Sequence, residues 1–110
     1  MKIICSNDIK NKFLIIEITE EIDDYTANKI RNRVDFEIEK NIPDKVIFDF
    51  NKVTFMDSSG IGMLIGRYKL VSSLGGKIYM MNVRPSVKKI FEISGIPRII
   101  PIIEDVEKVV

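Results

Sequence analysis

Residues 54–69 read TFMDSSGIGMLIGRYK, and the rest of the chain can be placed around this run. An apolar, β-rich segment at residues 46–50 comes just before it. After it, apolar side chains recur at helical spacing, at Ile61, Leu64, Ile65, Tyr68 and Val71. The acid, the two hydroxyls and the glycine at residues 57–60 therefore lie where a strand turns into a helix. Backbone N–H groups in a first helical turn have no intrahelical partner and can hold an anion.

Alternating and helical patterns predict the other elements in chain order. These are strands at 2–6 and 13–19 around a polar turn at 7–11, a helix from Asp23 or Asp24 to Lys40, the strand at 46–50, a helix ending at Gly75-Gly76, a strand at 77–83, a helix from Pro85 to Gly95, a strand at 99–103 and a short helix at 104–110. Pro43 ends the first helix, and Pro101 confines its strand to a sheet edge. A hairpin followed by alternating strands and helices predicts an α/β fold with a mixed sheet and right-handed crossovers.

Composition limits the class of protein. The 110 residues are expected to form one domain, residues 1–110, and 45% are apolar, which suffices for a core. The balance of 17 basic and 16 acidic residues argues against nucleic acid as a partner, and no block of like charges suggests a membrane surface. The single cysteine, Cys5, allows no intramolecular disulfide, and no signal-peptide core or membrane-spanning run is present, so we expect a cytoplasmic protein.

Several kinds of chemistry are excluded by residue type. A serine hydrolase elbow needs glycines two residues either side of its serine, but Asp57 and Ile61 flank Ser59, and the chain has no histidine to act as base. A metal site would have to use carboxylates alone. The clustered acids at residues 20–24 are explained by helix capping and solvation. We therefore expect no catalytic residue, no metal and no cofactor.

The glycines of the central run leave one alternative open. Gly60, Gly62 and Gly66 approach the dinucleotide fingerprint, but the third glycine is one residue late and no phosphate-binding lysine accompanies them. Small residues that let the helix approach the sheet or a partner explain the pattern better. A small nucleotide-binding domain stays as the alternative from a different class.

Ser58 is a candidate modification site. Phosphorylation would add about −1.5 to −2 charges at a helix N-terminus, which tolerates negative charge. Asp57 beside it would make the local field strongly negative. The simpler interpretation is that Ser58 or Ser59 caps the helix.

These residues resemble a known family. The segments DSSGIG at 57–62 and GRYK at 66–69 are similar to the anti-sigma factor antagonists, the STAS domains of bacterial partner-switching systems, and most of all to their sigma-F, sporulation branch. The resemblance runs from about residue 13 to 100. It also includes Glu21-Ile22-Asp23 with Thr26-Ala27, Gly75-Gly76, the stretch PSVKKIF at 85–91 and Ser94-Gly95.

The resemblance implies a function as a binding module and kinase substrate. The family's first serine corresponds to Ser58, which an anti-sigma factor with ATP-dependent serine kinase activity would phosphorylate and a PP2C-type phosphatase would reset. The unphosphorylated chain, a monomer when free, would bind the anti-sigma factor and release the sigma factor. Asp57, Ser59 and Gly60 would complete the switch. The candidates for the partner surface are Glu21, Asp23, Met56, Ile61, Gly62 and Arg67.

Some alternatives and departures remain at this stage. Arg67 is equally compatible with a solvated helix charge, and Met56 with a core position. The circuit could belong to general stress response rather than sporulation. The family usually has glycine where this chain has Glu20, which is expected to alter the loop, and the last helix is expected to be short for the family.

Overall fold

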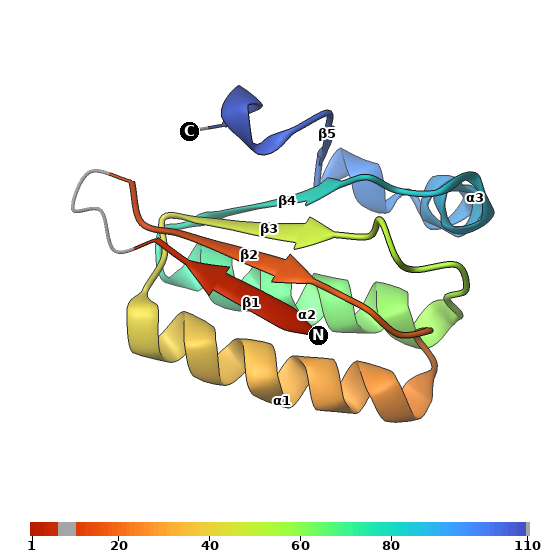
Figure 1. Ribbon diagram of the computed structural model, residues 1–110, viewed down its shortest axis with the longest axis horizontal. Helices are drawn as coiled ribbons and strands as arrows, with labels where there is room; N and C mark the ends of the chain where they lie inside the picture. The colour runs from red at the N-terminus through yellow and green to blue at the C-terminus, as the bar shows by residue number, and fades with distance from the viewer. Residues whose placement is uncertain (7–10, 110) are drawn as a thin grey trace.

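The computed structural model describes residues 1–6 and 11–109 of the chain as a five-stranded sheet with three α-helices (Figure 1). The elements are β1 Lys2–Cys5, β2 Phe13–Glu17, α1 Asp24–Asn41, β3 Lys45–Asp49, α2 Ser58–Ser73, β4 Lys77–Met81, α3 Pro85–Ser94, η1 Ile96–Arg98, β5 Ile102–Ile103 and η2 Val106–Lys108. The elements η1 and η2 are 3-10 helices. Residues 7–10 of the expected turn lie outside the described residues.

The strand order is β1-β2-β3-β4-β5. β1 pairs antiparallel with β2, and every later neighbour pairs parallel. This is the mixed sheet that an initial hairpin and successive strand–helix units predict, so the α/β fold class is confirmed.

The helices α1 and α2 lie side by side across one face of the sheet, and α3 lies near the carboxyl ends of β3 and β4 (Figure 1). Alternate strand side chains face these helices, because successive side chains of a strand point to opposite faces. Phe50, just after β3, meets Phe91 of α3 edge to face, with ring centroids 5.3 Å apart. The core also contains Leu14, Ile16, Val46, Phe48, Ile78 and Met80 from the strands and Ala27, Ile30, Val34, Ile38, Met63, Leu64 and Val71 from α1 and α2.

The central strand is confirmed as buried on both faces, since Val46, Ile47 and Phe48 are all fully buried. The predicted helix ends are confirmed as well. Asp23 caps α1, and α2 ends before Gly75, whose φ of 83° lies in the left-handed region that glycine enters without strain.

The carboxyl-terminal predictions were partly wrong. The strand expected at 99–103 is reduced to β5, because the N–H groups of Ile99 and Ile100 donate back to the carbonyl of Ile96 and so continue the turn of η1. Pro101 does lie at the sheet edge, where its carbonyl accepts from the N–H of Met80 at 2.9 Å. Within residues 104–109 only the 3-10 turn η2 forms in place of the expected helix, because so few residues cannot nucleate an α-helix. Residue 110 lies outside the described residues.

Candidate functional site at the carboxyl edge of the sheet

Two loops meet at the carboxyl edge of the parallel strands. The loop from β2 to α1 and the loop from β3 to α2 are joined by an isolated parallel bridge between Ile22 and Met56. In it the N–H of Ile22 donates to the carbonyl of Phe55, and the N–H of Asp57 donates to the carbonyl of Ile22, each at 3.0 Å. The segment Glu21–Asp23 is thereby held beside the start of α2, although Asp57 comes 34 positions after Asp23 in the sequence.

The β3–α2 loop is also tied to the start of α3. Arg84 Nε donates to the carbonyl of Asn51 at 2.6 Å, and Ser86 Oγ donates to the carbonyl of Thr54 at 3.0 Å. The loop that carries the polar cluster is therefore hydrogen-bonded to neighbouring segments on both sides, and its backbone is fixed before any partner arrives.

Asp57 is the residue that caps α2. Its Oδ1 accepts from the N–H of Ser59 at 2.8 Å, and its carbonyl accepts from the N–H of Gly60 at 3.1 Å. The expectation that Ser58 or Ser59 caps this helix was wrong, because α2 already begins at Ser58 and the N-cap position falls on Asp57. Ser58 is the first residue of α2 and is exposed, and within residues 1–6 and 11–109 its hydroxyl has no hydrogen-bond partner.

Gly60 and Met56 form the inner side of this turn. Both are buried, and a Cβ at Gly60 would collide with the side chain of Met56 and come within 3.2 Å of Ile22 Cγ2. Close approach is therefore the reason for glycine here. The same explanation fails for Gly62 and Gly66, where an added Cβ would meet nothing within 4 Å. Met56 belongs to the core, so it supports the loop from beneath instead of facing solvent.

Asp23 and Thr26 form a reciprocal cap at the start of α1. The N–H of Thr26 donates to Asp23 Oδ1 at 2.9 Å, and the N–H of Asp23 donates to Thr26 Oγ1 at 2.9 Å. The backbone hydrogen bond from Thr26 is the main reason that the pKa of Asp23 lies below its usual value. Thr26 Oγ1 also donates to the carbonyl of Glu21 at 2.8 Å. The side chain of Glu21 is exposed.

Glu20 does not disturb this loop. Its φ is not positive, so the backbone has no need of the glycine usual in the family. Its carboxylate lies 3.9 Å from Lys29 Nζ and 3.8 Å from the amino terminus. The expected alteration of the loop by Glu20 therefore amounts to these two surface ion pairs.

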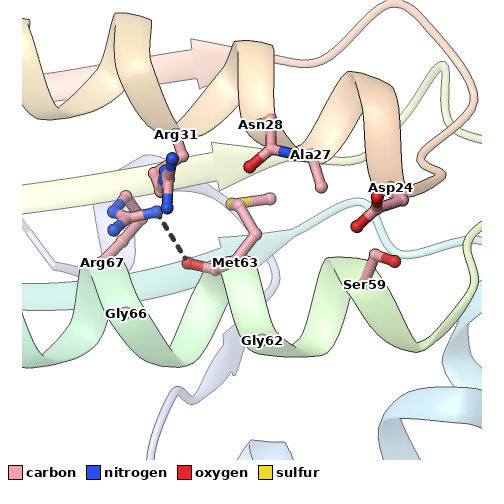
Figure 2. A pocket seen from close by; sticks show the side chains of 9 residues that line it. All are labelled: Asp24, Ala27, Asn28, Arg31, Ser59, Gly62, Met63, Gly66 and Arg67. Carbon is pink, nitrogen blue, oxygen red and sulfur yellow. Dashed lines mark hydrogen bonds between the residues drawn. The ribbon is translucent and has the colours of Figure 1, made fainter.

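A groove of about 260 Å³ runs between α1 and α2 from the same edge (Figure 2). Its lining consists of Asp24, Ala27, Asn28 and Arg31 from α1 and Ser59, Gly62, Met63, Gly66 and Arg67 from α2. Figure 2 shows Asp24 and Ser59 facing each other at one end, and Arg31 and Arg67 pointing toward each other at the other end. Exposed Gly62 lies between, while half-buried Ile61 packs against the core.

Arg67 is a buried ion-pair partner, so its interpretation as a solvated helix charge was wrong. Its side chain is 8% exposed, Nε lies 2.6 Å from Asp35 Oδ1 of α1, and Nη1 donates to the carbonyl of Met63 at 3.3 Å. Burial, and after it the nearby charge of Arg31, lower the pKa of Arg67, while Asp35 opposes the shift. The pair connects α1 to α2 below the surface of the groove.

The polar residues of α1 were missed from the sequence. Asp24, Asn28, Arg31 and Asp35 recur at three- and four-residue spacing, which places them on one flank of the helix, beside the apolar face. That spacing was a usable signal, but it shows only that the residues share a flank. It does not show that α2 packs along it.

Two kinds of feature are absent from the part of the chain that the structure describes. No group of histidine, cysteine, aspartate or glutamate side chains within residues 1–6 and 11–109 is arranged to hold a metal ion. Over the same residues, no helix combines the length and apolar character needed to cross a membrane.

A family model described as the STAS domain matches residues 5–109. The chain belongs to the STAS domain family. This STAS domain is 33% identical to the anti-sigma F factor antagonist of Paenibacillus polymyxa, over 84% of this chain and 79% of that relative. It is 30% identical to the anti-sigma-B factor antagonist of Bacillus subtilis strain 168, over 87% of this chain and 82% of that relative.

The fold of this STAS domain is also found in a solved structure. The anti-sigma factor antagonist SpoIIAA in its unphosphorylated form superposes with a TM-score of 0.79 at 24% identity, and the match covers 98% of this chain and 93% of that one. The mixed five-stranded sheet with three helices is therefore the STAS fold.

Proposed function

We propose that this STAS domain is an anti-sigma factor antagonist that is switched off by phosphorylation of Ser58. The observation that carries the proposal is the position of Ser58. It is exposed, it is the first residue of α2, and its hydroxyl is not used for capping, because Asp57 has that role. The relatives named anti-sigma F and anti-sigma-B factor antagonists support the assignment.

The proposed cycle uses chemistry supplied by its partners. An anti-sigma factor with serine kinase activity transfers the γ-phosphoryl group of ATP to Ser58 Oγ, so an O–P bond forms, ADP leaves and the hydroxyl proton is released. A PP2C-type phosphatase hydrolyses the ester and returns the hydroxyl and inorganic phosphate. The chain acts as substrate and binding module, and its proposed location is the cytoplasm.

The partner surface is proposed to surround Ser58. Glu21 and Asp23 lie beside the start of α2 through the bridge between Ile22 and Met56, so acidic groups from both loops border the serine. A phosphate added there would have to lose water when the partner docks. An unpaired charge buried at an interface costs several kcal/mol, and each ~1.4 kcal/mol is about tenfold in affinity.

The site is tested by incubating the protein with the serine-kinase anti-sigma factor of the same genome and ATP, followed by phosphopeptide mapping. We expect phosphate on Ser58, no incorporation in Ser58→Ala, and normal incorporation in Ser59→Ala. Ser59 is the matched control because it is the adjacent hydroxyl, half-buried, with its N–H bound to Asp57. Phosphate found on Ser59 in the wild type would overturn the assignment.

Binding gives a second test of the same proposal. Ser58→Ala should bind the unmodified anti-sigma factor like the wild type, because the hydroxyl makes no hydrogen bond that its loss would break. Ser58→Asp should bind at least about tenfold more weakly, because it places a charge where the partner loses water. Equal affinities of the two variants in calorimetry would count against a charge switch at this position.

The circuit is proposed to be the sigma-F one, because the segments DSSGIG at 57–62 and GRYK at 66–69 resemble that branch most of all. Sequence identity does not separate the two circuits, since it is 33% and 26% for two anti-sigma F factor antagonists and 30% for an anti-sigma-B factor antagonist. The alternative is a stress circuit of the sigma-B kind. Binding measured against one anti-sigma factor of each kind separates them, and preference for the sigma-B partner would overturn the sporulation assignment.

A further inference from the structure

We propose that the groove between α1 and α2 is a second part of the partner-binding surface, and that Arg31 holds an acidic side chain of the anti-sigma factor there. The inference rests on the proposed function and names a recognition element beyond Ser58 and its loop. It starts from Figure 2, where the guanidinium groups of Arg31 and Arg67 converge at one end of the groove.

The charge at that end is not balanced. Arg67 is paired with Asp35, with Nε and Oδ1 2.6 Å apart, so the charge of that carboxylate is already matched. Among residues 1–6 and 11–109, Arg31 has no ion pair, and its charge contributes to lowering the pKa of Arg67. One positive charge is left over at the mouth of a partly buried site, and an anion there would relieve the repulsion between the two arginines.

The groove has room for a side chain. The α2 side of the groove presents Gly62 and Gly66, and the space where their side chains would lie is empty to 4 Å. On the α1 side, the small side chain of Ala27 takes up little of the groove, and Met63 is buried between the helices. A glutamate or aspartate side chain that enters over the glycines can reach Arg31, whose planar fork of donors suits a carboxylate.

The groove is continuous with the proposed phosphorylation site. Ser59, which follows Ser58, lines its opposite end together with Asp24. A partner that covers Ser58 and extends along α2 therefore passes over Gly62 and Gly66 to Arg31. A macromolecular partner fits this geometry better than a small anion, because the groove extends from Asp24 and Ser59 to Arg31 and Arg67 and its two ends have opposite charge.

The test compares charge reversal on two faces of α1. Arg31→Glu and Arg33→Glu make the same change two residues apart on an exposed helix surface, but Arg33 does not line the groove. Arg31→Gln serves as a second variant that removes the charge without reversing it. Affinity of each for the unmodified serine-kinase anti-sigma factor is measured by calorimetry, with thermal denaturation to confirm folding.

We expect Arg31→Glu to bind at least about tenfold more weakly, equivalent to ~1.4 kcal/mol, with Arg31→Gln intermediate and Arg33→Glu within about twofold of the wild type. An acid-to-lysine change in the anti-sigma factor that restores binding to Arg31→Glu would identify the contacting residue. If Arg31→Glu and Arg31→Gln bind like the wild type, the inference is overturned and the proposed function stands. If the wild type itself fails to bind, both are overturned.

Discussion

Gly60 is the residue near Ser58 whose identity is imposed by packing. A Cβ at this position would collide with the side chain of Met56 and come close to Ile22, the two residues that bridge the loops. A larger residue would push the start of α2 away from that bridge, and with it the serine that α2 presents. Gly62, one position beyond Ile61 on the same helix, has open space around it. Close packing therefore explains the glycine at position 60 but not the glycine at position 62.

The contrast predicts opposite effects of one substitution. Gly60→Ala should lower the free energy of unfolding by about 1–3 kcal/mol, the usual cost of overpacking. Gly62→Ala should raise it by about 0.5–1 kcal/mol, because alanine is the better helix former and nothing obstructs its methyl group. Urea denaturation of both variants measures the difference. Equal stabilities would show that Met56 moves aside and that close packing does not explain Gly60.

Residue-scale prediction from the sequence had a clear limit. The place of Ser58 at the start of a helix follows from the switch in hydrophobic period around it. The choice of cap did not, because aspartate and serine are both good caps and the outcome depends on one residue of helix register. The burial of Arg67 could not be read either, because its partner Asp35 is on another helix, 32 residues earlier.

At the scale of elements, α1 and α2 start in the same way at the same edge. Each begins with an aspartate N-cap whose carboxylate accepts a backbone N–H, Asp23 for α1 and Asp57 for α2. The bridge between Ile22 and Met56 lies one residue before each cap. The two helix starts therefore form one unit, and each is capped by a carboxylate.

The lowered pKa of Asp23 predicts how this unit responds to acid. A carboxylate whose folded pKa lies below its unfolded value contributes stability that is complete above the unfolded value, near 3.8, and is lost as pH falls through the folded value. Asp23→Asn is the matched control, because asparagine caps helices well but does not titrate. Between about pH 5 and pH 2, we expect the melting temperature of the wild type to fall further than that of Asp23→Asn. Parallel pH profiles would show that the charge of Asp23 adds nothing to the cap.

Elements with strong periodicity were the predictable ones. α1, α2 and α3 begin and end close to their sequence signals, because apolar spacing, caps and glycines agree there. The segment after Gly95 was mispredicted because Pro97 and Pro101 leave little room for either regular pattern, and the chain forms η1, the two residues of β5 and η2 instead. Which of these short elements forms depends on contacts with the rest of the molecule, and the sequence alone does not show those contacts.

At the scale of the whole molecule, Ser58 lies on a rigid edge. The β3–α2 loop is bonded to the β2–α1 loop through the bridge at Ile22 and to the start of α3 through Arg84 and Ser86. Strand β3, which leads into this loop, has three consecutive fully buried residues, Val46, Ile47 and Phe48. Because the loop is hydrogen-bonded on both sides, we expect a charge added at Ser58 to leave this edge in place.

This rigidity leads to the prediction that phosphorylation of Ser58 leaves the fold in place. A charge at a helix N-terminus gains about 0.3–1 kcal/mol from the dipole. Here Asp57 already holds the N–H of Ser59, so the phosphate remains in solvent, where salt screens its repulsion from that carboxylate. A net effect of ~1 kcal/mol or less corresponds to a change in melting temperature of about 4–8 °C or less in a domain near this size.

Calorimetry of the phosphorylated and unmodified proteins measures that change, and the unmodified Ser58→Ala variant controls for loss of the hydroxyl. We expect melting temperatures within about 5 °C of each other, together with near-superimposable amide NMR spectra away from the start of α2. The same phosphate should weaken anti-sigma factor binding by orders of magnitude, because it loses its water only at the interface. A drop of ~10 °C or more on phosphorylation would mean that the switch acts by changing the conformation of this domain. Loss of binding would then report that rearrangement instead of a charge buried at the contact surface.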